Sequence, residues 1–191
     1  MASNGIEVEI KVSLTEKEFL QIKDKLNEIA KFEKKVKEED EYFDLPNRSF
    51  LSYEYPFEWL SIRKRGNKNI LNFKKLYPIN SPEFTHADEF ETEIGDADKL
   101  SKIFSAIDLK SIVIVDKIRE CYNYKDEFEI ALDNVKELGY FIEVEALVDF
   151  GGVEETRRKI FEFAEMLGVD ISNKMNRGYP YLLMKARGLI K

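Results

Sequence analysis

The stretch GIEVEIKV (residues 5–12) alternates aliphatic and charged side chains without a break. Because successive side chains of a β-strand point to opposite faces, this stretch predicts a strand with one aliphatic face and one charged face. The charged face carries Glu7, Glu9 and Lys11. For a single strand, the simpler interpretation is the solvent-facing side of an antiparallel sheet. The alternative is that two carboxylates and an amine converge on a ligand.

Composition restricts the class of protein. The chain has 191 residues, which suits a single domain over 1–191, and it is 43% hydrophobic and 35% charged, as in a soluble globular protein. Its formal charge of −7 argues against nucleic acid or a membrane surface as a partner. No apolar run is long enough to span a bilayer and no signal peptide is evident, so we expect a cytoplasmic protein. Cys121 is the only cysteine, which leaves no intrachain disulfide.

Three helices are indicated among a larger number of strands. The first follows a capping box at Thr15, the second spans 97–108 after Asp96, and the third spans 153–167 and ends at Gly168. Strand patterns occupy 58–65, 69–76, 88–94, 111–124, 126–133 and 139–148, and the segment 34–40 favours a solvated connection. The segment GYPYLLMKA favours a short helix or strand. Crossover helices between successive strands are missing, so we predict an α+β fold whose antiparallel sheet of about eight strands closes into a barrel.

The charged faces of several strands carry one sign of charge each. Bases recur on strands that are separate in the chain, and acids recur near both ends of the chain. The bases are Arg63, Arg65, Lys74, Lys117 and Arg119, and the acids are Glu7, Glu9, Glu143 and Glu145. Guanidinium and ammonium groups bind phosphate oxygens, and carboxylates select hard cations such as Mg²⁺ or Mn²⁺. Without a Walker A motif, side chains would hold the phosphates of such a polyanion.

These motifs, in this order, resemble the CYTH superfamily, also called triphosphate tunnel metalloenzymes. The resemblance begins with E-x-E-x-K at residues 7–11 and continues over nearly the whole chain. It includes DEYFD (40–44), LSIRKR (60–65), NFKK (72–75), EFETE (89–93), KIRE (117–120), Asp133 and LGYFIEVE (138–145). It implies an eight-stranded antiparallel barrel with a charged lumen and helices packed outside, so that the aliphatic face of the first strand points outward against the helices.

The resemblance also implies roles for individual residues. The implied metal ligands are Glu7, Glu9, Asp133, Glu143 and Glu145, with Mg²⁺ or Mn²⁺ as the cofactor. The implied triphosphate-binding residues are Lys11, Arg63, Arg65, Lys74, Lys117 and Arg119. Glu89 and Glu91 would orient these bases, bind a second metal or position water, and Lys174 or Lys185 would add a C-terminal base. We expect Lys11, Glu9 and Arg119 to be catalytic.

The reaction itself is less constrained by the sequence. We predict hydrolysis of a small-molecule triphosphate, either inorganic tripolyphosphate or a nucleoside triphosphate. The main alternative is a class IV adenylate cyclase, although Asn47 and Ser49 depart from the residues that this branch carries beside Arg48 and Phe50. Thiamine triphosphatase and a non-catalytic binding module are further alternatives. His86 favours a structural role over a catalytic one, and a homodimer is compatible with the composition.

Overall fold

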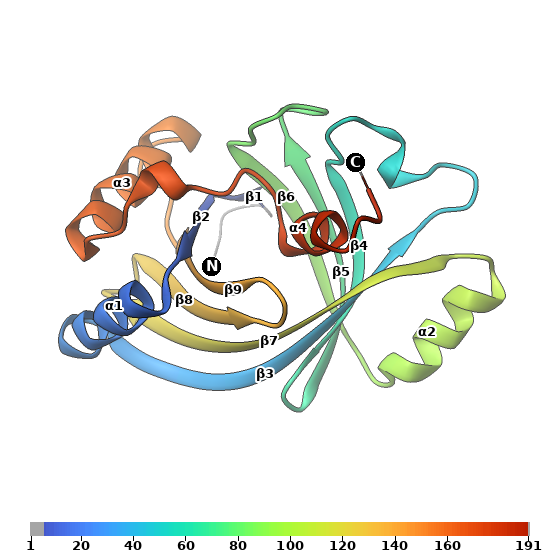
Figure 1. Ribbon diagram of the computed structural model, residues 1–191, viewed down its shortest axis with the longest axis horizontal. Helices are drawn as coiled ribbons and strands as arrows, with labels where there is room; N and C mark the ends of the chain where they lie inside the picture. The colour runs from blue at the N-terminus through green and yellow to red at the C-terminus, as the bar shows by residue number, and fades with distance from the viewer. Residues whose placement is uncertain (1–5, 191) are drawn as a thin grey trace. The chain divides into compact units, whose positions relative to one another are not determined.

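A computed structural model describes residues 6–190 of the chain (Figure 1). Over this range the strands are β1 Ile6–Glu7, β2 Glu9–Leu14, β3 Lys31–Asp44, β4 Glu58–Arg65, β5 Lys68–Tyr77, β6 His86–Ile94, β7 Lys110–Tyr124, β8 Phe128–Val135 and β9 Gly139–Ala146. The α-helices are α1 Glu16–Ile29, α2 Ala97–Ala106, α3 Val153–Leu167 and α4 Tyr179–Ala186. No helix in this range is both long and apolar enough to cross a membrane.

The described strands form one sheet in the order β1-β6-β5-β4-β3-β7-β8-β9-β2. The first and last strands of this order, β1 and β2, are separated along the chain only by Val8. This is the strand connectivity of a β-barrel, and the predicted α+β barrel fold is confirmed. The described strand count is nine instead of eight, because the first predicted strand is interrupted at Val8 and its two pieces pair with different neighbours.

The chain divides into two compact units, each built from two segments. Among the described residues, the first unit comprises 6–36 and 117–176, and the second comprises 37–116 and 177–190. The long strands β3 and β7 each contribute residues to both units. The segment 34–40, predicted as a solvated connection, lies within β3, so that prediction was wrong. Its charged residues belong to a strand because the neighbouring strands β4 and β7 supply the hydrogen-bonding partners that local sequence does not reveal.

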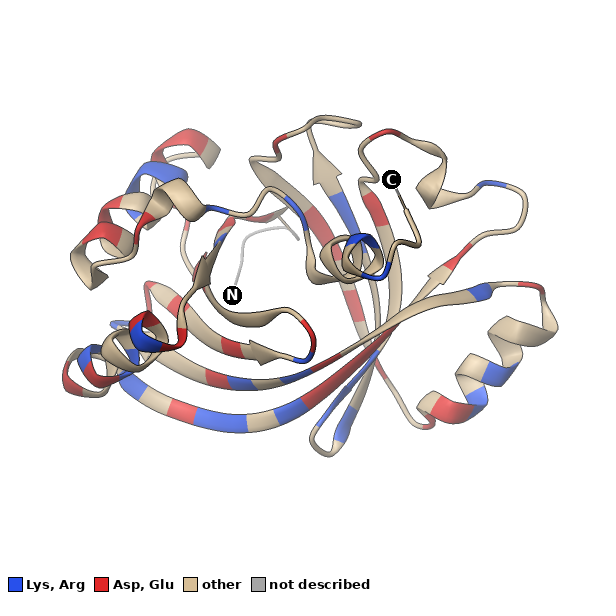
Figure 2. Ribbon diagram, viewed as in Figure 1, with Lys and Arg blue, Asp and Glu red and all other residues tan. Residues whose placement is uncertain are grey.

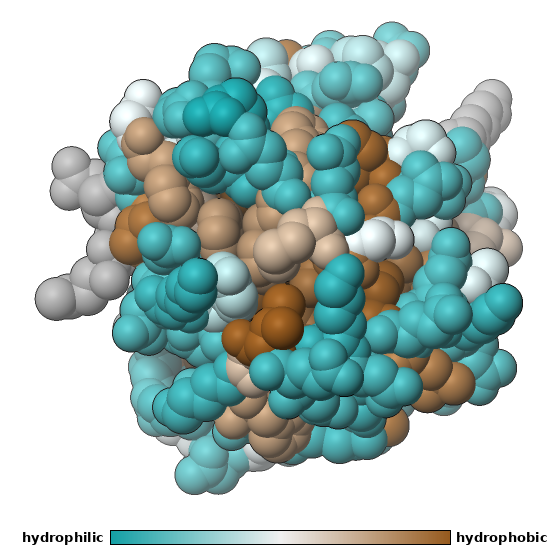
Figure 3. All heavy atoms as spheres, turned by 90° about the vertical axis from the view of Figure 1, so that its left-hand side faces the viewer, coloured by the Kyte–Doolittle hydropathy of each residue, from teal (hydrophilic) through white to brown (hydrophobic). Residues whose placement is uncertain are grey.

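In the first unit, the aliphatic faces of the strands pack against α1 and α3. Val8, Ile10 and Val12 are buried in one hydrophobic cluster with helix residues such as Leu26 and Ile160. The predicted orientation is therefore confirmed for these three strand residues, whereas Ile6 is 43% exposed. The remaining exposed surface near α1 and α3 is largely hydrophilic, with hydrophobic side chains showing between polar ones (Figure 3).

Local sequence accounts for the ends of the helices in this unit. The Thr15 hydroxyl accepts a hydrogen bond from the Glu18 backbone, and the Glu18 carboxylate accepts one from the Thr15 backbone, which completes the predicted capping box before α1. α3 ends at Gly168, whose φ of 85° lies in the left-handed region. Both predicted signals are confirmed.

In the second unit, α2 packs on the strand face that carries Phe43 and Ile62. It begins after the Asp96 N-cap, as predicted, but ends at Ala106 instead of residue 108. The segment GYPYLLMKA forms the helix α4, which settles the choice between helix and strand. In both units the strand face opposite the helices carries charged residues such as Lys11 and Arg63. Charged segments recur along the strands (Figure 2).

Candidate active site

Four charged side chains on adjacent strands of the first unit form a connected ion-pair network, here called the first cluster: Lys11, Arg119, Asp133 and Glu143. Lys11 lies directly opposite Glu143 in the β2–β9 pair, and its Nζ is 2.6 Å from Glu143 Oε1. Arg119 lies directly opposite Asp133 in the β7–β8 pair. The cluster therefore results from cross-strand register, in which paired side chains meet on one face of the sheet.

Arg119 is the residue that joins the two pairs. Its Nε and Nη2 donate to the two oxygens of Asp133 at 2.7 and 2.5 Å, a bidentate arrangement that fixes the plane of the guanidinium. Nη2 also donates to Glu143 Oε2. Both oxygens of Glu143 thus contact cations, and the Asp133 side chain is fully buried.

Burial and charge act in opposite directions on Glu143. Burial raises the pKa of its carboxyl, but Arg119, Lys11 and Lys117 lower it, and the net result is a pKa well below the usual value. Lys117, which is itself buried, is therefore close enough to add its positive charge to the first cluster. Glu143 is an anion held among three cations.

The other predicted metal ligands lie beside this cluster on the same strands. Glu9 is directly opposite Glu145 in the β2–β9 pair, and Glu145 is directly opposite Glu129 in the β8–β9 pair. This gives a row of three carboxylates across three neighbouring strands, which is costly unless cations lie among them. Glu129 was not predicted as a site residue, although its spacing of four from Asp133 on one strand places both on the same face. Glu7 is buried on β1.

Within residues 6–190, no three carboxylate, imidazole or thiolate side chains converge as a complete metal site. The donors in this region are nevertheless carboxylate oxygens, without histidine or cysteine, and their chemistry fits Mg²⁺ or Mn²⁺. Asp133 and Glu143, both predicted as ligands, form ion pairs with Arg119 and Lys11, respectively.

The second unit carries a separate polar group, here called the second cluster: Arg63, Asn72, Glu89 and Glu91. Arg63 Nη1 is 3.0 Å from Glu89 Oε1 and 2.8 Å from Glu91 Oε1, and its Nε donates to Ser61 Oγ at 3.3 Å. Burial lowers the pKa of Arg63. Its four neighbours raise this pKa by a larger amount, so the net pKa lies above the ordinary value and the guanidinium stays protonated; these neighbours are Asp40, Tyr42, Glu89 and Glu91. Glu89 and Glu91 both contact Arg63 directly.

The remaining predicted bases have varied surroundings. Arg65 Nη1 lies 3.9 Å from Glu91 Oε1, and Arg65 Nε lies 3.7 Å from Glu38 Oε2. Lys74 is directly opposite Glu89 in the β5–β6 pair. The two candidate C-terminal bases differ. Lys174 pairs with Val12 in an isolated bridge and places Nζ 5.9 Å from the centre of the Phe161 ring, on the helix-covered face. Lys185 is exposed in the last turn of α4.

Arg48 and Ser49, which lie in the stretch compared with the cyclase branch, hold the loop after β3. Arg48 Nη1 donates to Glu58 Oε2 at 2.7 Å, and Ser49 Oγ donates to Asp44 Oδ2 at 2.6 Å. The lone histidine, His86, stacks on Tyr77 with ring centres 5.2 Å apart. These contacts anchor backbone segments.

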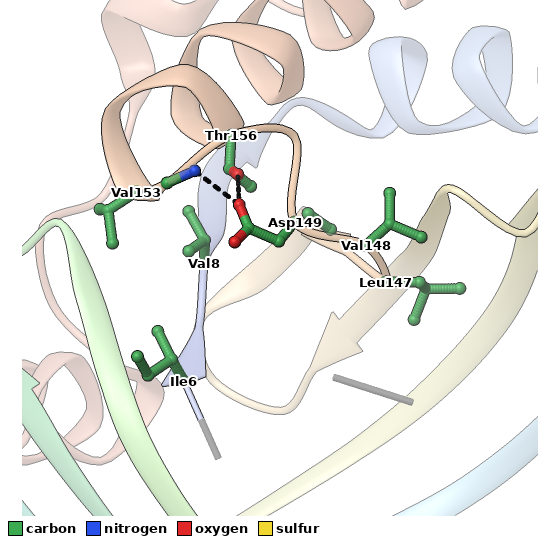
Figure 4. A pocket seen from close by; sticks show the side chains of 9 residues that line it. Ile6, Val8, Leu147, Val148, Asp149, Val153 and Thr156 are labelled. Atoms are coloured by element: carbon green, nitrogen blue, oxygen red, sulfur yellow. Dashed lines mark hydrogen bonds between the residues drawn. The ribbon is translucent and has the colours of Figure 1, made fainter. Parts of the chain in front are cut away.

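A small cavity of about 120 Å³ in the first unit lies apart from the first cluster (Figure 4). Apolar side chains such as Ile6, Val8 and Val153 line it, and Asp149 is its charged residue. Asp149 Oδ1 accepts hydrogen bonds from the Gly151 and Gly152 backbone at 2.9 and 2.6 Å, which explains the lowered pKa of its carboxyl. Its role is to fix the turn before α3.

Comparisons with known proteins agree with this fold. The family model for the CYTH domain matches residues 5–179. A Methanocaldococcus jannaschii protein that bears the provisional name adenylate cyclase MJ0240 is 30% identical over 188 residues, which cover 96% of this chain and 99% of that protein.

Solved structures show the same similarity. The PH1819 protein of Pyrococcus horikoshii OT3 is 31% identical, with a TM-score of 0.79 and coverage of 94% of this chain and 98% of that chain. HpAC1 of Hippeastrum, whose structure is described with a dominant triphosphatase activity, has a TM-score of 0.66 at 16% identity and covers 96% of this chain and 95% of that chain.

Proposed function

The chain belongs to the CYTH domain family, and we propose that it is a divalent-metal-dependent triphosphatase. Its proposed substrate is inorganic tripolyphosphate or a nucleoside triphosphate. Members of this family include cyclases and triphosphatases, and HpAC1 is a relative in fold for which triphosphatase activity is named as dominant.

The observation that carries this proposal is the first cluster. Lys11, Lys117 and Arg119 supply three positive charges around Glu143. Asp133, the other carboxylate of the cluster, pairs with Arg119, so the cations outnumber the anions by one. A triphosphate presents several negatively charged oxygens, which ammonium and guanidinium groups bind well. The cluster thus has the cations for a polyanion, and the adjacent row of Glu9, Glu145 and Glu129 has the oxygen donors for a metal.

Five charged residues of the first unit have roles in the proposed hydrolysis. Lys11 and Arg119 bind phosphoryl oxygens and stabilise the charge that spreads over the transferring group. Asp133 holds Arg119 in one orientation through its bidentate contact. Glu9 and Glu145 would hold the metal, which when bound would polarise phosphoryl oxygens and lower the pKa of a water molecule. Water attacks the terminal phosphorus, and the bond to the bridging oxygen of the next phosphate breaks.

Adenylate cyclase is the second candidate, and the name of the M. jannaschii relative favours it. Cyclisation needs the 3′ hydroxyl of ATP at the α-phosphorus, with pyrophosphate as the leaving group. Against it stand Asn47 and Ser49, which replace residues of the cyclase branch. Ser49 instead bonds to Asp44 at the end of β3.

The test is to incubate the purified protein with tripolyphosphate, ATP or thiamine triphosphate, each with Mg²⁺, Mn²⁺ or EDTA. Phosphate, pyrophosphate and cyclic AMP are measured separately. We expect metal-dependent phosphate release. Cyclic AMP as the main product would replace the proposal with the cyclase, and tight binding with no product would replace it with a binding module.

A further inference from the structure

The side chain of Asn72 on β5 occupies the centre of the second cluster. It is only 1% exposed, and its Nδ2 donates to Glu89 Oε1 at 2.6 Å and to Glu91 Oε1 at 3.2 Å. These contacts fix which end of the amide is nitrogen, because the carbonyl oxygen in that place would face two carboxylates. The orientation of Asn72 is therefore determined by its neighbours.

The other end of this amide is unusual. Asn72 Oδ1 is buried and accepts no hydrogen bond from any residue in the described part of the chain. A buried carbonyl oxygen without a donor costs free energy, and such atoms in native proteins call for a specific explanation. The explanation we consider is a ligand that brings a hydrogen-bond donor to this oxygen.

The surroundings of Asn72 Oδ1 discriminate between ligand groups. The carboxylates of Glu89 and Glu91 both contact the Asn72 amide, and both also contact Arg63. A phosphate group offers acceptors and negative charge, which this acceptor-rich spot disfavours. A hydroxyl offers the donor that Oδ1 lacks. Of the two carboxylates, Glu91 has the more exposed side chain, at 38% against 18% for Glu89.

Cations for phosphates lie on the same strand face. Arg65 is two residues from Arg63 on β4, and Lys74 is two residues from Asn72 on β5, so their side chains share the face of the second cluster. A ligand with phosphates at one end and hydroxyls at the other matches this arrangement of bases beside acceptors.

We propose that Asn72 Oδ1 accepts a hydrogen bond from a sugar hydroxyl of a nucleotide whose phosphates lie at Arg65 and Lys74, which makes Asn72 a residue that favours nucleoside triphosphates over inorganic tripolyphosphate. This inference rests on the proposed function, since it names the substrate class of the same protein. Tripolyphosphate has no hydroxyl to donate, so it gains nothing from Asn72.

The test measures binding without turnover. Calorimetry in EDTA compares ATP, 2′,3′-dideoxy-ATP and tripolyphosphate on the wild-type chain and on Asn72→Ser. We expect the wild type to bind ATP about tenfold more tightly than the dideoxy analogue, equivalent to about 1.4 kcal/mol. In Asn72→Ser we expect ATP affinity to fall by about the same factor, while tripolyphosphate affinity changes less than twofold. Asn69→Ser, on the opposite face of β5, is the matched control and should bind all three as the wild type does.

Two results would overturn the inference. Equal binding of ATP and dideoxy-ATP by the wild type removes the sugar hydroxyl as the donor, and this arm needs no variant. An equal loss of ATP and tripolyphosphate binding in Asn72→Ser assigns Asn72 only to holding Glu89, Glu91 and Arg63 in place. Because turnover is not measured, hydroxyl-dependent binding without phosphate release in the activity assay would refute the triphosphatase and leave the Asn72 assignment intact.

Discussion

Replacement of Glu143 by glutamine removes one negative charge from the first cluster while nearly preserving side-chain shape. At an effective dielectric constant of about 20, the Lys11–Glu143 contact at 2.6 Å corresponds to an attraction of roughly 6 kcal/mol before desolvation is subtracted. Loss of one partner from a buried ion pair typically costs about 3–5 kcal/mol net. Arg119 keeps its bidentate contact with Asp133 in this variant. We therefore expect Glu143→Gln to lower the free energy of unfolding by about 3 kcal/mol, the lower end of this range.

The same substitution should have the opposite effect on anion binding. Lys11 and Arg119 lose an anion that competes with phosphate oxygens, so Glu143→Gln should bind tripolyphosphate in EDTA about tenfold more tightly, a gain of about 1.4 kcal/mol.

Thermal denaturation and calorimetry measure these effects together. For a chain of 191 residues, 3 kcal/mol corresponds to a Tm lowered by about 6–12 °C, and added tripolyphosphate should raise Tm more in the variant than in the wild type. The matched control is Glu162→Gln, which removes an exposed carboxylate paired with Arg158 on α3 and should change stability by less than about 1 kcal/mol. A variant that loses stability but binds tripolyphosphate no more tightly would refute the competition between Glu143 and phosphate.

Three further outcomes follow from the same network. Glu9→Gln should abolish turnover and weaken Mn²⁺ binding, measured by electron paramagnetic resonance, while Tm shifts by only a few degrees; wild-type Mn²⁺ affinity would contradict its role as a ligand. Arg119→Lys should lower kcat by about 10–100-fold at similar KM, since a lysine cannot make the bidentate contact with Asp133; an unchanged kcat would contradict the orienting role. The pKa of the Glu143 carboxyl in the folded chain lies well below its ordinary value of about 4.5, so its contribution to stability is complete above about pH 4.5 and is lost as pH falls through the folded-state pKa. The Tm difference between wild type and Glu143→Gln should therefore narrow in acid, and a constant difference would count against this assignment.

The alternation of side chains in residues 5–12 was sufficient to separate the aliphatic face of the first strand from its charged face. Ile10 and Val12 pack against the helices, and Lys11 lies opposite them among charged residues. Capping signals were equally informative, because a cap depends on residues three or four positions apart. Such local patterns do not depend on the rest of the fold.

Features set by strand register were not predictable in the same way. The roles inferred for Glu129 and Asn72 depend on which residues lie opposite them on neighbouring strands, namely Glu145 for the first and Glu91 for the second. Lys174 sits on the helix-covered face because it pairs with Val12, a contact across most of the chain. The strand character of residues 34–40 likewise comes from pairing with other strands.

The central claim is that water attacks the terminal phosphorus of a triphosphate. Turnover of ATP with Mg²⁺ or Mn²⁺ in oxygen-18-labelled water, followed by phosphorus NMR, tests it most directly. The account predicts labelled inorganic phosphate together with unlabelled ADP. Unlabelled pyrophosphate accompanied by cyclic AMP would contradict it, because in that reaction the ribose hydroxyl and not water attacks phosphorus.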